Sequence, residues 1–174
     1  ATKSGGRGGA VYLQGSVIEG VLTNCSNTTF TNSIFTNNYA GMNGGAIAFD
    51  VDASENKIIN SHFIGNYARR DGGAIHFATG SFNNNIGYSE FNNSRAGDDG
   101  GAIFIGQGSG NFTIDHISCY NTTAESIHDT EIQGEDANSH SNGGVICVTG
   151  DNVTISNSDF DSNYIVKSAR DHTY

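Results

Sequence analysis

A short motif recurs five times along the chain: two glycines, then alanine or valine, then isoleucine or valine. The first glycines of successive copies lie 36, 28, 28 and 43 residues apart. Self-similarity at a period of roughly 20–50 residues is the signature of a repeat architecture, in which one unit stacks on the next. The copies are Gly8–Val11, Gly44–Ile47, Gly72–Ile75, Gly100–Ile103 and Gly143–Ile146.

Two further markers recur in a fixed order between the glycine pairs. The first is a large apolar residue: Phe30, Ile58, Ile86, Ile114 and Ile155. The second, five or six residues later, is an aromatic residue with a small polar residue at the third position after it: Phe35/Asn38, Phe63/Asn66, Phe91/Ser94, Tyr120/Thr123 and Phe160/Asn163. Each repeat thus holds three short segments rich in β-branched and aromatic residues and bounded by Gly or Asn, a pattern typical of strands. We predict an all-β fold, a right-handed parallel β-helix (solenoid) with about five coils of roughly 28 residues and three short strands in each.

Alternation of side chains assigns the faces of these strands, since successive residues point to opposite sides. Two uniformly apolar columns are expected to face inward: Val11, Ile47, Ile75, Ile103 and Ile146, then Leu13, Phe49, Phe77, Ile105 and Val148. A serine column before the aromatic residues is also expected inward, with hydrogen bonds running along it: Ser33, Ser61, Ser89, Ser118 and Ser158.

The columns left facing outward are unusually apolar for a solvent face. They hold Ala10, Ala46, Ala74, Ala102 and Val145, then Tyr12, Ala48, His76, Phe104 and Cys147. A contiguous apolar patch marks a contact surface. We therefore predict a lateral contact strip made of Tyr12, Ala46, Ala74, His76, Ala102 and Phe104.

Charge and length exclude several classes of protein. With 8 Lys and Arg against 18 Asp and Glu, the net charge of −10 would repel nucleic acid and anionic lipid. Neutral glycans, cations and basic proteins remain compatible with this charge as binding partners. No apolar run of about 18 residues is present, so this segment is not expected to insert into a membrane. The 174 residues favour one domain over 1–174.

Clustered carboxylates would be needed for a polysaccharide-cleaving enzyme, sometimes with calcium. The best candidates are Asp71 and Asp99, each directly before a glycine pair, with Asp98 alongside. The same column holds Arg7, Asn43 and Asn142, so a turn position is the simpler interpretation. We assign no catalytic residue and no metal ligand, and expect no cofactor, leaving calcium open.

An acidic insertion over residues 124–142 lengthens the fourth repeat. Loops on a rigid scaffold often carry recognition, so we predict a partner-binding loop, with a disordered acidic excursion as the alternative. Its carboxylates are Glu125, Asp129, Glu131, Glu135 and Asp136.

The sequence allows two kinds of covalent modification, N-glycosylation and a disulfide. Six N-x-Ser/Thr sequons are candidates for glycosylation: Asn24, Asn27, Asn92, Asn111, Asn121 and Asn152. Cys119 and Cys147 flank the insertion, and alternation turns both outward. A disulfide between them would stabilise by roughly 3–4 kcal/mol in an oxidising compartment; two unpaired thiols are the alternative.

The paired markers, such as Gly72–Ile75 and Phe63–Asn66, resemble the repeats of chlamydial-type polymorphic outer-membrane proteins and of adhesin-like β-helix proteins. The resemblance implies a large secreted or surface-anchored protein whose β-helix is a stalk and adhesive surface, with no catalytic residues to carry over. We expect a non-enzymatic, adhesin-like or filament-forming protein, extracellular or on the cell surface. The alternative is a polysaccharide-active lyase or hydrolase.

The partners expected for such a segment are other copies of itself, or a protein or glycan on a host or neighbouring cell. The sequence starts inside a repeat and stops at Tyr174 without a polar cap. Uncapped coils expose strand edges. The natural protein is therefore expected to be longer, or its copies to stack end to end.

Overall fold

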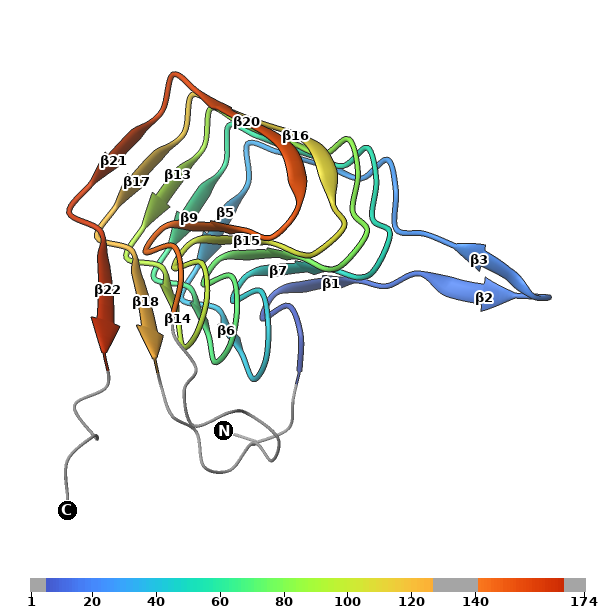
Figure 1. The fold of residues 1–174 in the computed structure, drawn as a ribbon, viewed down its shortest axis with the longest axis horizontal. Helices are drawn as coiled ribbons and strands as arrows, with labels where there is room; N and C mark the ends of the chain where they lie inside the picture. Colours follow the sequence, from blue (N-terminus) through green and yellow to red (C-terminus); the bar gives the residue numbers. More distant parts are fainter. Residues whose placement is uncertain (1–5, 127–140, 168–174) are drawn as a thin grey trace, which may run out of the picture.

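In a computed structural model, which describes residues 6–126 and 141–167, the chain winds into a parallel β-helix (Figure 1). Each coil contributes one strand to each of four parallel five-stranded sheets, and consecutive coils are neighbours in every sheet. The predicted fold class is confirmed, and a fourth short strand, in most coils only two residues long, joins the three expected in each coil.

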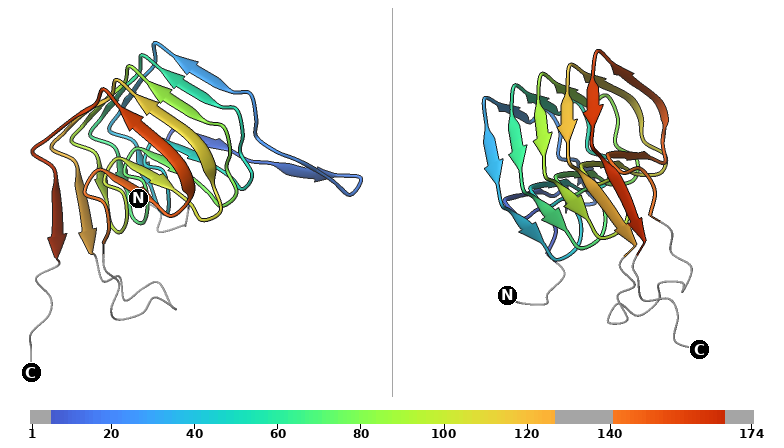
Figure 2. Two further views of the ribbon diagram at one scale, coloured as in Figure 1. Left: turned by 45° about the horizontal axis from the view of Figure 1, so that its top comes forward. Right: turned by 90° about the vertical axis from the view of Figure 1, so that its left-hand side faces the viewer.

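The four sheets run side by side along the stack (Figure 2). The first contains β1 (Val11–Leu13), β7 (Ile47–Phe49), β11 (Ile75–Phe77), β15 (Ile103–Ile105) and β19 (Ile146–Val148). The second contains β4 (Thr29–Thr31), β8 (Lys57–Ile59), β12 (Asn85–Gly87), β16 (Gly110–Asp115) and β20 (Asp151–Ser156). The third contains β5 (Ile34–Thr36), β9 (His62–Ile64), β13 (Glu90–Asn92), β17 (Ser118–Tyr120) and β21 (Asp159–Asp161). The fourth contains β6 (Tyr39–Ala40), β10 (Tyr67–Ala68), β14 (Arg95–Ala96), β18 (Thr123–Ser126) and β22 (Tyr164–Lys167).

The two departures from the 28-residue step have separate origins. In the first coil, β2 (Ser16–Ile18) and β3 (Val21–Thr23) form an antiparallel hairpin that projects away from the stack (Figure 1). Its two-residue turn, Glu19 and Gly20, has positive φ at both positions (51° and 80°), as tight hairpins require. The later departure falls between β18 and β19, where 127–140 lie outside the described residues.

The corners of the coils hold ten of the 21 asparagines of the chain. At the corners the backbone adopts positive φ, which asparagine tolerates better than most residues other than glycine. At three corners the amides also form ladders: Asn60 donates to Asn32 at 2.6 Å, Asn121 to Asn93 at 2.7 Å and Asn111 to Asn83 at 3.2 Å. The columns are Asn27, Glu55, Asn83, Asn111 and Asn152; Asn32, Asn60, Tyr88, His116 and Asn157; Asn37, Gly65, Asn93, Asn121 and Ser162; and the first glycine of each pair.

The second glycine of each pair touches the next coil. A Cβ atom on Gly73 would lie 2.0 Å from the carbonyl oxygen of Gly101 and 2.6 Å from the backbone of Arg95. Gly45 meets Gly73 in the same way, again at 2.0 Å. No side chain fits there, so the glycine pair fixes both the turn and the distance between coils.

The core consists of identical or similar side chains stacked from coil to coil. Phe49 and Phe77 stack with ring centroids 4.5 Å apart, and Phe63 and Phe91 stack at 4.8 Å. Buried amides form an inner ladder, in which Asn84 Oδ1 accepts from the backbone and side-chain nitrogens of Asn56, both at 3.0 Å. In the inner coils the isoleucine and phenylalanine columns predicted to face inward are buried, as expected.

The fourth repeat departs from the predicted register by one residue. Cys119, and not Tyr120, pairs with Phe91 and Phe160 in the aromatic column. Cys119 is 2% exposed and Tyr120 is 52% exposed. Ile117 likewise takes the place predicted for Ser118 in the serine column and is buried. The hydrogen bonds between coils set the register, so the column is occupied by the residue 28 positions later, whatever its type.

The alanines of the predicted lateral strip face the core, so this part of the prediction is wrong. Ala46, Ala74 and Ala102 have no exposed surface and pack in the main apolar cluster. The backbone nitrogens of Ala46 and Ile47 both donate to Ala74 O, at 2.9 and 3.0 Å. In an extended strand, successive N–H groups point to opposite sides. Here two successive N–H groups point the same way, so the alternation of side chains does not hold at the alanine, and the strand begins only at the isoleucine.

The glycine contact gives a direct test on one coil. We expect Gly73→Ala to lower the free energy of unfolding by about 3 kcal/mol, because the added methyl group overlaps the backbone of the next coil. The control is Gly87→Ala, also buried, where a Cβ would meet neighbours at an ordinary 3.5 Å. It should change stability by less than about 1 kcal/mol. Urea unfolding followed by circular dichroism measures both, and equal losses would contradict the packing described.

Candidate functional site

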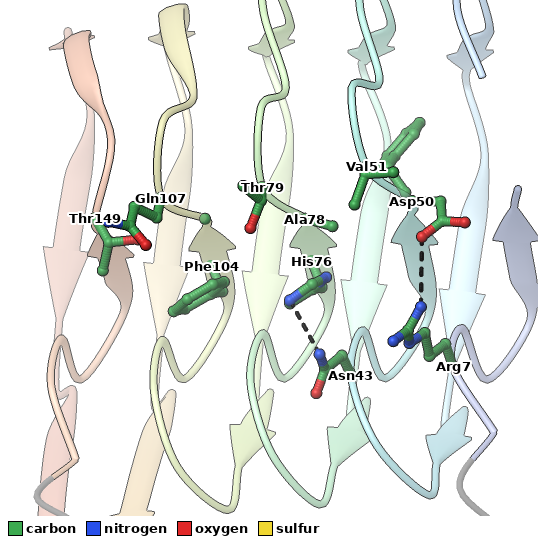
Figure 3. A pocket seen from close by; sticks show the side chains of 12 residues that line it. Arg7, Asn43, Asp50, Val51, His76, Ala78, Thr79, Phe104, Gln107 and Thr149 are labelled. Carbon is green, nitrogen blue, oxygen red and sulfur yellow. Dashed lines mark hydrogen bonds and ion pairs between the residues drawn. The ribbon is translucent and has the colours of Figure 1, made fainter. Parts of the chain in front are cut away.

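A groove lies on the outer side of the first sheet. Its volume is about 600 Å³. His76 and Phe104 form its floor, and Arg7 and Asn43 stand on one side (Figure 3). The opposite wall consists of residues that follow the strands of successive coils: Asp50, Val51, Ala78, Thr79, Gln107 and Thr149. We call this feature the His76 groove.

His76 is the most unusual residue of the groove. Its side chain is buried, with the residue only 6% exposed, and its ring stacks on that of Phe104 at 5.1 Å with an interplanar angle of 4°. Burial lowers the pKa of His76 to about 3, and the positive charge of Arg7 adds to this effect. The ring is therefore neutral at any physiological pH, with one nitrogen protonated and the other an acceptor.

Two buried polar atoms in the groove have no hydrogen-bond partner in the part of the chain that the structure describes. The Nε2 atom of His76 lies 3.1 Å from the amide nitrogen of Asn43, so this hydrogen bond assigns the ring proton to Nδ1. Both Nδ1 of His76 and Oδ1 of Asn43 are left unpaired. Each buried unpaired group costs about 1–3 kcal/mol. Buried polar groups are normally paired with protein or with ordered water, so a water molecule or a ligand hydroxyl would satisfy these two atoms.

A charged pair stands at one end of the groove. The Arg7 guanidinium lies 3.4 Å from a carboxylate oxygen of Asp50 and donates to the Tyr12 hydroxyl at 3.3 Å. Arg7 is partly exposed, so this ion pair adds only about 0–1 kcal/mol to stability. Both groups keep donor and acceptor capacity that faces the groove.

The predicted contact strip is thus divided between two environments. His76 and Phe104 line the groove, and Tyr12 lies at its end through its hydrogen bond with Arg7, whereas the three alanines are in the core. The sequence did not indicate Asn43, Asp50, Thr79, Gln107 or Thr149 as site residues. The residues that follow the strands of the first sheet form a wall of the groove only because of how the chain turns there. Residue type alone does not predict that turn.

The carboxylates considered for catalysis connect coils and do not line the groove. Asp71 accepts a hydrogen bond from the Asp99 backbone nitrogen at 3.4 Å, and Asp99 accepts one from the Asn142 backbone at 2.6 Å. Burial and the nearby charges of Asp98 and Asp99 raise the pKa of Asp71 from 3.8 to about 7. Within 6–126 and 141–167 no group of three or more His, Cys, Asp or Glu side chains is arranged to hold a metal ion.

The raised pKa makes stability depend on pH. Folded Asp71 keeps its proton up to about pH 7, whereas the unfolded chain loses it near pH 4. The contribution of Asp71 to the free energy of unfolding is therefore fully present below pH 4 and is lost as the pH rises to 7. Asp71→Asn, the residue found in this column at Asn43 and Asn142, should therefore be the more stable protein at pH 8, by about 4 kcal/mol. At pH 4 the two proteins should unfold alike.

Thermal unfolding at several pH values measures this difference. The control is Asp159→Asn, an exposed aspartate on the third sheet. A stability gain for Asp71→Asn that is the same at pH 4 and pH 8 would contradict the assignment.

The candidate glycosylation sites coincide with the corners. Asn27, Asn111, Asn121 and Asn152 all have positive φ, and Asn92 lies on β13. The side-chain nitrogen of Asn121, which a glycan would modify, already donates along its ladder. The need for asparagine at corners therefore accounts for most of the sequons. Asn24 is exposed, beside the hairpin.

Only the first carboxylate of the predicted partner loop is described. Glu125 belongs to β18 and forms an ion pair with Arg95, whose guanidinium lies 5.4 Å from the centre of the Tyr67 ring. Glu125 therefore links the neighbouring strands β18 and β14 on the surface of the fourth sheet. Asp129, Glu131, Glu135 and Asp136 lie outside the described residues.

Of the two alternatives left open for Cys119 and Cys147, the structure has the unpaired thiols. Cys119 faces the core from the third sheet, as a result of the one-residue register difference, while Cys147 belongs to the first sheet. Burial raises the pKa of both thiols to about 12. They are therefore poor nucleophiles at neutral pH.

Comparison with known proteins identifies one part of the chain. Residues 32–50 match the model of the Chlamydia polymorphic membrane protein repeat. This stretch runs from a corner asparagine through β5, β6 and β7, so it contains the aromatic marker Phe35/Asn38 and the glycine motif Gly44–Ile47. The match supports the resemblance drawn from the markers. Searches of curated proteins and of solved structures give no match. The described residues contain no helix long and apolar enough to cross a membrane.

Proposed function

Starting from this repeat match, we propose that the chain is a non-enzymatic, adhesin-like segment of a cell-surface protein. The main support for this proposal is that a membrane-protein repeat motif lies in a β-helix whose outer columns present exposed aromatic side chains. Tyrosine is enriched where proteins bind partners, because it offers a large apolar ring and a polar hydroxyl. The exposed tyrosines include Tyr39, Tyr88, Tyr120 and Tyr164, each at least 52% exposed.

The physics of the scaffold supports this role. Each outer column is fixed by a backbone ladder, so side chains from distant parts of the sequence hold constant spacings. Tyr39 and Tyr67, for example, are 28 residues apart in sequence and have ring centroids 5.4 Å apart. Preordered side chains lose little conformational freedom on binding, which favours affinity.

The last coil supports a continued stack as part of the proposal. Ile155 and Phe160 occupy core columns but are 43% and 44% exposed, whereas Ile114 and Phe91 in inner coils are fully buried. Exposed core residues and open strand ladders favour pairing with a further coil. We include in the proposal that a second copy of the chain supplies this coil. The carboxylates considered for the polysaccharide-cleaving alternative, Asp71 and Asp99, accept hydrogen bonds from neighbouring coils.

Adhesion can be measured with beads coated with the whole chain and applied to a panel of cultured animal cells. We expect attachment above that of uncoated beads, and a drop of about fivefold or more in the triple variant Tyr39→Thr, Tyr88→Asn and Tyr120→Thr. These replacements occur elsewhere in the same columns, at Thr123, Asn60 and Thr36, so the fold should be kept.

The control changes three exposed threonines of the second sheet: Thr29→Ser, Thr113→Ser and Thr154→Ser. It should attach as the unmodified chain does. Absence of attachment to every cell type, or full attachment by the tyrosine variant, would contradict the proposal.

A further inference from the structure

We propose that the His76 groove binds a neutral oligosaccharide, laid along the stack across several coils. This inference rests on the proposed surface function and names the chemistry of one ligand. It combines three observations: the two unpaired buried polar atoms, the shape of the groove, and the charges around it.

The unpaired atoms favour a hydroxyl group. Nδ1 of the neutral His76 ring is a donor and Oδ1 of Asn43 is an acceptor, and both residues line the groove, although the two atoms themselves are buried. A hydroxyl both donates and accepts, so a ligand rich in hydroxyl groups can offer an acceptor to Nδ1 and a donor to Oδ1. A carboxylate only accepts and an ammonium group only donates, so each would leave one of the two unpaired.

The shape of the groove favours a chain of similar units. It reaches from Arg7 in the first coil to Thr149 in the fifth, and successive coils lie about 4.8 Å apart. One wall offers a polar side chain in nearly every coil, with Asp50, Thr79, Gln107 and Thr149 in order (Figure 3). This period is close to the length of one sugar unit in an extended glycan.

The floor suits the apolar patches of a sugar ring. His76 and Phe104 form a stacked pair whose ring edges line the groove, and aromatic surfaces provide favourable contact for C–H groups. A peptide is the less suitable ligand. Among the described strands, β7, β11 and β15 beneath the middle of the groove already pair with a neighbour on each side, so a peptide strand cannot be added between them.

The charge around the groove favours a neutral glycan over an acidic one. Among the described residues that line the groove, the carboxylate of Asp50 and the guanidinium of Arg7 are the charged groups, and the two compensate each other. The whole chain carries a net charge of −10, which repels an anionic polymer. An Asp–Arg pair can accept from one sugar hydroxyl and donate to the next.

The test uses the full chain, with histidine labelled by ¹⁵N, and four soluble probes: cellotetraose, maltotetraose, mannotetraose and the tetramer of N-acetylglucosamine. We expect at least one probe to bind and to shift the Nδ1–H resonance of His76. The variant His76→Phe should weaken this binding at least tenfold. It should still fold, because phenylalanine occupies the next position of the column at Phe104 and the unpaired ring nitrogen is removed.

The matched control is His62→Phe, on the preceding coil, on the third sheet and away from the groove. It should bind the probe as the unmodified chain does. The inference is overturned if none of the four probes binds, if His76→Phe binds as well as the unmodified chain, or if tetragalacturonate, an acidic tetramer, binds better than all four. Bead attachment that persists while no probe binds would overturn this inference and leave the proposed surface function standing.

Discussion

The contact between the second glycine of one coil and the backbone of the next is the constraint on which the rest of the structure depends. With a Cβ there only about 2 Å from a carbonyl oxygen, no other residue lets the coils approach to hydrogen-bonding distance. Once the coils meet, the parallel ladders of four sheets fix the register of every column. Core stacking, corner asparagines and the outer columns all follow from that register.

The same register creates the groove. It places His76 directly above Phe104 and beside Asn43, although Asn43 and His76 are 33 residues apart in sequence. A strand with strict alternation would turn His76 to solvent. The turns on both sides of the first sheet instead build walls around the column, so the ring is buried and its pKa falls to about 3. The groove therefore results from both the ladder, which sets positions, and the turns, which set depth.

The fold was predictable from sequence because the stack repeats one spacing, and the 28-residue step between glycine pairs reports that spacing directly. The sites were less predictable. Tyr120 is aromatic and Ser118 is a serine, so residue type suggested a register that the backbone ladder overrules in favour of Cys119 and Ile117. The alanines were assigned by alternation, which fails where two successive amides share one carbonyl. The groove was missed because its walls are turn residues whose course no periodic pattern encodes.

Removal of one whole coil tests the register most directly. Deletion of residues 72–99 takes out 28 residues and joins Asp71 to Gly100, which recreates the Asp-Gly-Gly junction. If register governs the fold, this shorter chain will keep its β-sheet circular dichroism and unfold cooperatively. Deletion of 72–85 removes half a coil, joins Asp71 to Ile86 and should leave a chain that does not fold. Cooperative unfolding of both chains, or loss of structure in the 28-residue deletion, would contradict the account.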